Sequence, residues 1–162
     1  MISSLSLGEK LLISGKLITA RDLAHQRIIE TLAQGAKLPF VLGDYPLYYC
    51  GPTPAQKGFP IGSCGPTTAG RMDAYVPQLF AEGLRVMIGK GERSSLVQEQ
   101  INQYHGLYLV AIGGAGALYG KACTACKPLA YPELGPEAVY ELIVEEFICY
   151  VGMINVVKEL GG

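Results

Sequence analysis

The stretch GPTTAGRMD, residues 65–73, is the part of the sequence on which our prediction of the fold and the site depends. Its leading Gly-Pro pair is typical of a turn, Thr67 and Thr68 are good N-cap residues, and the apolar periodicity from Ala69 onward predicts a helix. Free backbone N–H groups at such a helix start bind anions, and Arg71 adds a planar fork for a carboxylate or phosphate. The alternative is an ordinary capped helix with a surface arginine.

The composition favours one domain with a local site. Because the 162 residues are 49% hydrophobic, they can bury a sizeable core, and we expect a single domain spanning residues 1–162. The net charge of −1, with acids and bases interspersed, argues against a nucleic-acid partner or an anionic membrane. No apolar run approaches the roughly 20 residues that span a bilayer, and no basic segment with a long apolar stretch begins the chain. We therefore expect a cytoplasmic protein.

The five cysteines are an odd number without an export signal, which favours free thiols over a disulfide framework. Cys123-x-x-Cys126 raises the alternatives of a metal site or a redox pair. A tetrahedral metal site needs two further ligands, and neither His25 nor His105 has the spacing to supply them. A thioredoxin-like pair opens a helix, whereas a Lys-Pro pair follows Cys126 at once, so we favour a structural role.

Segments with strand and helix character alternate along the chain, which predicts a layered α/β domain. Strands are expected at residues 10–19, 37–42, 46–50, 85–88, 107–112 and 139–144, the first of them bent or divided at its Ser-Gly pair. Helices are expected between Thr19 and Gly35, over residues 69–83 and over residues 95–105. The first and third helices would begin with capping boxes, Thr19-x-x-Asp22 and Ser95-x-x-Gln98.

Prolines and glycines predict where these elements break. Pro77 removes one helical hydrogen bond, so we expect a kink or a restart at residues 76–77. Residues 51–65 would form a long surface loop that delivers the chain to Thr67. The glycine run at residues 113–117 misses a dinucleotide fingerprint and favours close backbone approach to a neighbour. Residues 147–157 are apolar enough for an edge element or a subunit contact.

Two further cationic residues, Arg21 and Lys90, are predicted at positions where α/β proteins often bind ligands. Arg21 falls in the first turn of the first helix, beside free N–H groups, with Asp22 as a possible cap and His25 on the same helix face. As a lone histidine, His25 is interpreted first as a hydrogen-bonded structural residue. Lys90 follows a buried strand between two glycines, and ligands of layered α/β folds collect beyond the carboxyl ends of strands.

Six motifs, in this order and spacing, resemble the β subunit, or C-terminal domain, of class I fumarases and tartrate dehydratases. They are ITARDLAH (residues 18–25), CGP (50–52), GPTTAGRMD (65–73), IGKG (88–91), IGG (112–114) and YPELG (131–135). The resemblance covers most of the chain, and GPTTAGRMD is closer to the fumarase branch than to the tartrate branch.

The resemblance implies an iron–sulfur hydro-lyase, active only with its α subunit, that interconverts fumarate and malate. It implies a swivelling β/β/α domain and a [4Fe-4S] cluster held by three cysteines of the α subunit, none of which matches a cysteine here. Thr67 would be the proton-transfer hydroxyl opposite an α-subunit aspartate, Thr68 would help to hold the substrate, and Arg21, Arg71 and Lys90 would anchor its carboxylates. The β chain would form a homodimer within a heterotetramer.

Three alternatives remain open from the residues alone. A tartrate or related hydroxydicarboxylate dehydratase is not separated from a fumarase, because discrimination among small dicarboxylates also depends on the absent subunit. A non-catalytic module that binds a small anion would use the same three cations. A redox protein would act through Cys123 and Cys126. The roles of these two cysteines and of the tail after Phe147 are not predicted.

Overall fold

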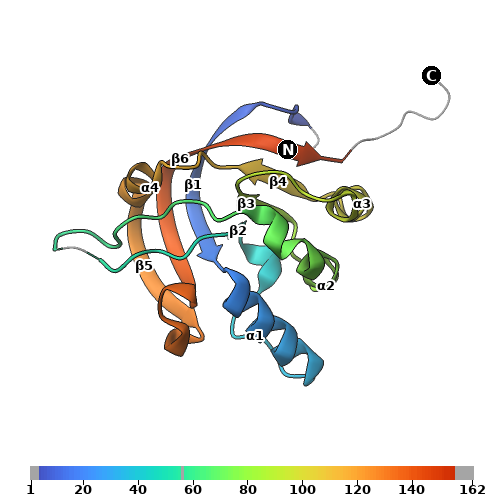
Figure 1. The fold of residues 1–162 in the computed structure, drawn as a ribbon, viewed down its shortest axis with the longest axis horizontal. Coiled ribbons are helices and arrows are strands. Elements are labelled where there is room, and N and C mark those ends of the chain that lie inside the picture. Colours follow the sequence, from blue (N-terminus) through green and yellow to red (C-terminus); the bar gives the residue numbers. More distant parts are fainter. Residues whose placement is uncertain (1–3, 56, 156–162) are drawn as a thin grey trace.

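A six-stranded mixed sheet forms the centre of the protein (Figure 1). The structure, a computed structural model, describes residues 4–55 and 57–155. The strands are β1 (Lys10–Thr19), β2 (Leu47–Tyr48), β3 (Val86–Gly89), β4 (Leu107–Val110), β5 (Cys123–Ala130) and β6 (Val139–Ile154). The helices are α1 (Asp22–Ala33), α2 (Val76–Ala81), α3 (Ser95–Tyr104) and α4 (Gly116–Ala122), with 3-10 helices η2 (Leu42–Asp44), η3 (Ala69–Tyr75) and η4 (Pro132–Glu137).

Strand β6 closes the sheet on itself. Strands β1, β2, β3 and β4 are neighbours and run parallel, while β6 pairs antiparallel with both outer members, β1 and β4. Strand β5 pairs with the first half of β6. The β1–β6 register shifts between Ile13 and Gly15, so β1 is the one bent strand expected there. Strand β6 thus joins β1 to β4 and closes these five strands into a ring. Because the four parallel strands are held between the two pairings with β6, their carboxyl ends stay together at one end of this ring.

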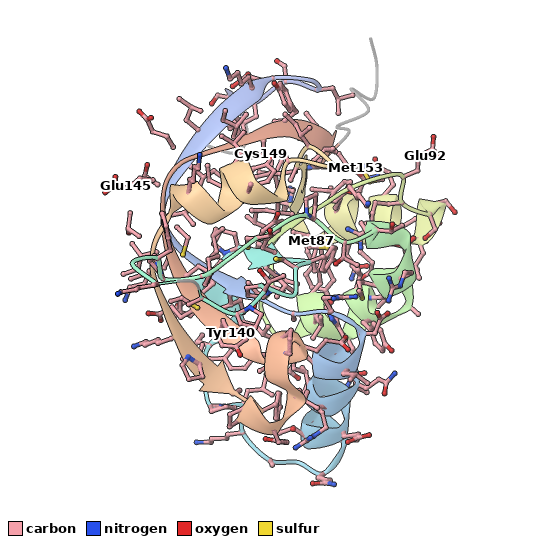
Figure 2. All side chains as sticks on the ribbon, turned by 60° about the vertical axis from the view of Figure 1, so that its left-hand side comes forward. Met87, Glu92, Tyr140, Glu145, Cys149 and Met153 are labelled. Atoms are coloured by element: carbon pink, nitrogen blue, oxygen red, sulfur yellow. The ribbon has the colours of Figure 1, made fainter. Side chains whose placement is uncertain are left out.

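Both faces of the parallel strands are buried. Successive residues of a strand point to opposite faces, and Leu17 belongs to one apolar cluster while Ile18 belongs to the other. Met87 and Ile88 divide between the clusters in the same way, and both are fully buried. Figure 1 shows α1, α2 and α3 together on one side of the sheet, and Figure 2 shows Met87 among the inner side chains. Burial on both faces explains why these strands appear in the sequence as continuous apolar runs.

The α/β prediction is confirmed, as are most of its elements. Strands at residues 10–19, 85–88 and 107–112 and the helix over residues 95–105 occur with ends shifted by up to two residues. Pro77 stands in the first turn of α2, where η3 ends and the chain restarts as an α-helix, as expected. The more specific swivelling β/β/α description remains a prediction. Within the described ranges, no helix has the length and apolar character needed to cross a membrane.

One prediction about the strands is wrong, and two others hold only in part. Residues 37–41 form no strand, because Pro39 lacks an N–H group, and Phe40 and Leu42 are buried in the core without joining the sheet. The strand expected at residues 46–50 is reduced to Leu47–Tyr48. Residues 147–154 belong to β6, in which 147–150 pair with β1 and 150–154 pair with β4 inside the closed sheet, so the edge-element alternative is wrong, while the alternative of a subunit contact remains a prediction. The rest of the expected 147–157 segment beyond residue 155 lies outside the described residues.

The capping boxes are also wrong. The N-cap of α1 is Arg21, without a side-chain cap, and the Thr19 hydroxyl instead accepts a hydrogen bond from the Tyr140 N–H at 3.2 Å. The N-cap of α3 is Ser94, whose own N–H donates to Asp73 Oδ2 at 2.7 Å. In both places a group distant in sequence forms the hydrogen bond, which a local pattern does not reveal.

Strand β5, helix α4 and the 3-10 helices η2 and η4 were not predicted. Strand β5 contains Pro128, which is tolerated because β5 lies at an edge of the sheet. Helix α4 begins in the glycine run, where the expected close backbone approach is confirmed: the Cys64 N–H donates to the Gly116 carbonyl at 3.0 Å. Gly120 of α4 faces the Gly62 carbonyl so closely that a β-carbon would overlap the oxygen.

A Gly120→Ala substitution is expected to destabilise the protein by about 1–3 kcal/mol, because the added methyl group meets a backbone carbonyl that cannot rotate away. The sign of this change in the free energy of unfolding is informative, because alanine within a helix is otherwise more stabilising than glycine by up to about 1 kcal/mol. Urea unfolding measures the difference. Gly70→Ala is the matched control, because its β-carbon would lie 3.4 Å from the Glu92 carbonyl, an ordinary contact. Equal stability of G120A and the parent protein would contradict the packing described here.

Candidate active site

The carboxyl ends of the four parallel strands form one rim, which we define as residues 20–21, 49–51, 90–91 and 111–113. Arg21 follows β1, Lys90 follows β3, and Tyr49 links β2 to the long loop. The Tyr49 N–H donates to the Ile88 carbonyl at 2.8 Å, and the Ala111 N–H donates to Gly89 at 2.8 Å, so the segments stay in register just past the strand ends. The sequence placed Arg21 and Lys90 correctly, beyond strand ends.

Thr67 and Thr68 are held against this rim as a short extended segment. The Thr67 N–H donates to the Tyr49 carbonyl at 2.7 Å, and the Ala69 N–H donates to the Lys90 carbonyl at 2.8 Å. The Lys90 N–H in turn donates to the Thr67 carbonyl at 3.3 Å, which makes a parallel bridge between Thr68 and Lys90. The prediction that free N–H groups of a capped helix bind an anion here is therefore wrong for these residues. The helix that follows is the 3-10 helix η3, without a side-chain cap.

The side chains of this segment differ in exposure. Thr67 is half-buried, and within the described part of the chain its hydroxyl has no protein hydrogen-bond partner, whereas Thr68 is exposed. Lys90 is half-buried and its side chain runs past Gly113, where a β-carbon would lie 3.5 Å from Lys90 Cδ. The Thr67 hydroxyl and the Lys90 ammonium group are thus available to a ligand at the same strand end.

Arg21 packs on the next segment of the rim. A β-carbon at Gly51 would lie 2.8 Å from both Cδ and Nη1 of Arg21, so only glycine leaves room for the guanidinium. The Nε of Arg21 is buried and has no hydrogen-bond partner among the described residues. The start of α1 already binds a carboxylate of this chain, because the Leu23 N–H donates to Glu137 Oε1 at 3.4 Å. A ligand carboxylate at Arg21 would therefore be bound by the guanidinium and not by this helix start.

An ion pair links the two arginine-bearing segments. Arg71 Nη2 of η3 pairs with Asp22 Oδ2 in the first turn of α1, and the Arg71 side chain remains 51% exposed. Asp22 was expected as a possible helix cap, but its carboxylate serves this cross-link instead. Through Asp22, Arg71 is brought to the helix that begins at Arg21. All five predicted site residues are thus linked to the rim at one end of the closed sheet. They are Arg21, Thr67, Thr68, Arg71 and Lys90.

His25 is a buried structural histidine, as its hydrogen-bonding pattern indicates. Its Nδ1 lies 2.7 Å from the Arg21 carbonyl, which can only accept, so Nδ1 carries the proton. The ring packs against Tyr49 and Tyr75, with centroids 5.6 and 5.1 Å away. Burial lowers the pKa of His25 from its ordinary 6.5 to about 4, against the opposing effects of the Arg21 carbonyl and Asp22. The ring is therefore neutral near pH 7.

Arg93, which lies in the connection between β3 and α3, was not predicted as a functional residue. Its side chain is fully buried, and its Nε pairs with Asp73 Oδ1 at 2.6 Å. Asp73 is the last residue of the GPTTAGRMD stretch, so this motif forms an ion pair with the buried Arg93. In the sequence Arg93 is one polar residue in a polar loop, and no spacing distinguishes it from a surface arginine.

The cysteines do not form a cluster site in this chain. An iron–sulfur cluster is bound by thiolates, and among the described residues no three His, Cys, Asp or Glu side chains are grouped to hold a metal ion. Cys50 and Cys64 lie 3.0 Å apart, sulfur to sulfur, in the core. Burial raises the pKa of Cys126 to about 11 and that of Cys149 to about 12, which keeps these thiols protonated. The residues present therefore do not fit a [4Fe-4S] centre.

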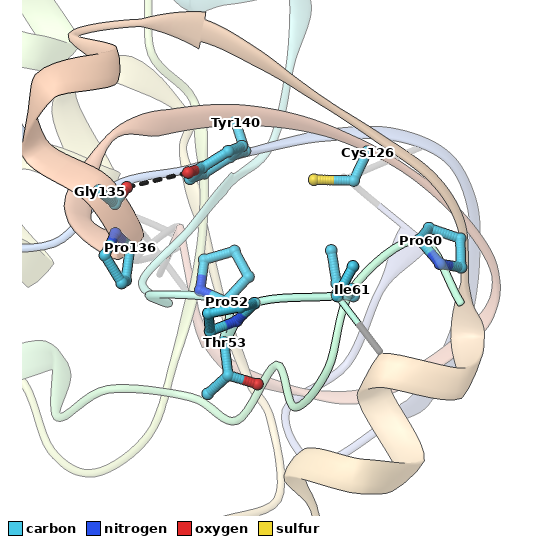
Figure 3. Close-up of a pocket in the computed structure, with 10 residues that line it drawn as sticks. Pro52, Thr53, Pro60, Ile61, Cys126, Gly135, Pro136 and Tyr140 are labelled. Carbon is cyan, nitrogen blue, oxygen red and sulfur yellow. Dashed lines mark hydrogen bonds between the residues drawn. The ribbon is translucent and has the colours of Figure 1, made fainter. Parts of the chain in front are cut away.

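A pocket of about 260 Å³ lies between the long loop, strand β5, η4 and the start of β6 (Figure 3). It is apolar, with several prolines of the loop on one side and Ile61, Cys126 and Tyr140 among its other lining residues. The Tyr140 hydroxyl donates to the Gly135 carbonyl at 3.0 Å. None of the five predicted site residues lines this pocket. Cys126 lies in strand β5 and not at a helix start, which leaves the redox interpretation of the Cys123 pair without support.

The lowered pKa of His25 predicts a specific pH dependence of stability. The unfolded chain takes up a proton near pH 6.5 and the folded chain only near pH 4, so stability is full above pH 6.5 and falls as the pH drops through this window. Between pH 7.5 and pH 5 we expect a loss of about 2 kcal/mol from this residue. The variant His25→Asn, whose amide can still donate to the Arg21 carbonyl, should lack this part of the loss in urea unfolding. The same loss in H25N would contradict the assignment.

Comparisons with known proteins identify the family of the chain. A family model described as Fumarase C-terminus matches residues 1–158. The chain is 39% identical over 152 residues to the aerobic class I fumarate hydratase of Escherichia coli (strain K12), and 40% identical over 153 residues to fumarate hydratase 2 of Leishmania major. Each match covers 93% of this chain, but only 28% and 27% of the respective relatives. The chain thus spans about a quarter of the length of these two enzymes.

A third relative is closer in length. The chain is 34% identical over 151 residues to a Methanocaldococcus jannaschii protein described as an L(+)-tartrate dehydratase subunit beta, and the match covers 90% of this chain and 77% of that one. The family model spans residues 1–158, nearly the whole chain. The chain therefore belongs to the Fumarase C-terminus family.

Proposed function

We propose that this chain is the β-type half of an iron–sulfur hydro-lyase that reversibly hydrates fumarate to malate. The observation that supports the proposal most is the convergence of Arg21, Thr67 and Lys90 on one rim, with Arg71 tied to the same place through Asp22. Small dicarboxylates need more than one cation to hold both ends, and this rim brings several cationic side chains together. Among the residues described, no carboxylate pairs with Arg21 or Lys90.

The proposed roles follow from position and chemistry. Arg21, Arg71 and Lys90 anchor the carboxylates, and Thr68, exposed beside Lys90, contributes to substrate binding. Hydration adds a hydroxyl group to one alkene carbon and a proton to the other, and Thr67 transfers that proton. A threonine hydroxyl is a weak acid and a weak base, so its alkoxide form requires nearby positive charge. Lys90, bridged to the same segment, is placed to supply it.

The remaining parts of the site belong to a partner in this proposal. A fumarase-type α subunit provides the opposing aspartate and the three cysteines of a [4Fe-4S] cluster, whose one iron without a cysteine ligand would be free to bind and polarise the substrate. The relatives support this division, since about three quarters of the Escherichia coli enzyme lies outside the match. We further propose that residues 1–162 act as one domain, that two β chains pair within a heterotetramer, and that the enzyme is cytoplasmic.

A second candidate is dehydration of L-tartrate or a related hydroxydicarboxylate. The match to the Methanocaldococcus jannaschii protein favours it, because that relative, unlike the two fumarate hydratases, is itself of a length similar to this chain. The same cations would bind either substrate. Which hydroxydicarboxylate fits then depends on side chains of the partner that contact the central carbons.

The assay that tests the proposal measures anaerobic fumarate hydration and L-tartrate dehydration by this chain, alone and after assembly with an α-type partner carrying its cluster. We expect activity only in the assembled protein. Fumarate as the better substrate supports the first candidate, and tartrate the second. An assembled protein with an intact cluster and neither activity would contradict both.

Substitutions at the two threonines separate chemistry from binding. In the assembled enzyme, Thr67→Ala should lower kcat by about 100-fold or more while KM changes little, because only the proton-transfer group is removed. Thr67→Ser keeps the hydroxyl and should retain a substantial part of kcat. Thr68→Ala should instead raise KM with kcat largely kept. Full turnover by T67A would reduce Thr67 to a structural residue.

A further inference from the structure

Arg93 is a buried cation for which the proposed chemistry has no use. Besides its ion pair with Asp73, its Nη2 donates to the Tyr49 hydroxyl at 3.0 Å. The guanidinium lies over two aromatic rings, 5.1 Å from the Tyr49 centroid and 4.7 Å from the Tyr108 centroid. Burial by itself lowers the pKa of Arg93, but Tyr49 and Asp73 outweigh it and raise the pKa. A buried charge is stable only where partners compensate it. Besides Met87 Sδ, which lies 3.7 Å from Nη1 inside β3, the partners Asp73, Tyr49 and Tyr108 connect Arg93 to the rim and to the segment that faces it.

The first connection runs through Tyr49 to Thr67. The Tyr49 side chain is fully buried, and its hydroxyl is held by Arg93. The backbone of the same residue accepts the Thr67 N–H at 2.7 Å and donates to the Ile88 carbonyl at 2.8 Å. A β-carbon at Gly89 would lie 2.7 Å from Tyr49 Cδ2, so the ring is also confined from the β3 side. Fixing the Tyr49 ring therefore fixes the carbonyl that holds the Thr67 segment.

The second and third connections reach Lys90 and Arg71. The Tyr108 hydroxyl donates to the Gly91 carbonyl at 2.8 Å, one residue after Lys90, while its ring lies against Arg93. Asp73 belongs to η3, the element that carries Arg71, and its other carboxylate oxygen accepts the Ser94 N–H at 2.7 Å. One guanidinium thus bridges η3, the end of β2 and the ring of Tyr108 in β4.

We propose that Arg93 is a positioning residue that clamps the Thr67, Arg71 and Lys90 segments in their mutual register through Tyr49, Asp73 and Tyr108. The residue touches no substrate atom and acts only through these contacts. The inference rests on the proposed function for its catalytic consequence, but its structural part concerns this chain alone. A planar fork is required, because three different groups are engaged at once and a lysine ammonium group does not reproduce that geometry.

Amide hydrogen exchange of the full chain tests the clamp without any activity measurement. In Arg93→Lys, the Thr67, Ala69 and Lys90 amides, which donate across the rim, should exchange at least about tenfold faster than in the parent protein. Arg85→Lys is the matched control. Arg85 also donates to two carbonyls, those of Phe80 and Leu84, and lies 4.9 Å over a tyrosine ring, but at the opposite end of β3.

The two outcomes are distinct. Faster exchange at the rim amides in R93K and not in R85K supports the clamp. Unchanged exchange in R93K, or an equal increase throughout the chain, overturns it and makes Arg93 an ordinary core residue. If R93K does not fold, Tyr49→Phe answers the same question, since it removes one hydroxyl group and keeps the ring.

Kinetics of the assembled enzyme separate the two arms of the clamp. Tyr49→Phe loosens the Thr67 side and should lower kcat about tenfold with KM kept, whereas Tyr108→Phe releases Gly91 beside Lys90 and should raise KM about tenfold with kcat kept. Equal changes of both parameters in both variants contradict separate arms. An inactive parent enzyme would refute the proposed function, while the exchange result would still decide the role of Arg93.

Discussion

The pairing of β6 with both β1 and β4 is the constraint on which the rest of the structure depends. Parallel strands leave a long connection after each carboxyl end, and an open sheet lets these connections spread apart. Because β6 holds both outer strands, the connections after β1, β2, β3 and β4 meet at one rim. The residues predicted to bind and to react come from three separate parts of the sequence, and this closure is what brings them to one place.

The rim combines paired and unpaired charge. Asp22 holds Arg71, Glu137 accepts from the start of α1, and Asp73 compensates the buried Arg93. These acids leave the guanidinium of Arg21 and the ammonium group of Lys90 without an ion-pair partner in the described part of the chain. The paired charges fix the segments, and the unpaired ones remain to attract an anion. In the proposed function, this division is what lets a protein whose net charge is only −1 recognise carboxylates locally.

Strand ends were predictable from the sequence because a buried parallel strand appears there as a short apolar run followed by glycine. This pattern located Lys90 correctly at the end of β3. The break at Pro77 was predictable for a similarly local reason. The reason given for an anion site at Thr67 was wrong, because its N–H is used by the Tyr49 carbonyl, a contact between segments far apart in sequence. Strand β5 and Arg93 were missed for the same cause: an edge strand with a proline and a buried arginine in a polar loop carry no local signature.

The central claim is that the carboxyl rim of the closed sheet binds the two carboxylates of the substrate. The most direct measurement is a crystal structure of the assembled enzyme with fumarate or malate bound. We predict carboxylate oxygens at about 2.7–2.9 Å from the nitrogens of Arg21, Arg71 and Lys90, with the Thr67 hydroxyl facing the carbon chain. A dicarboxylate bound wholly by the partner, or in the apolar pocket beside Tyr140, would contradict the account.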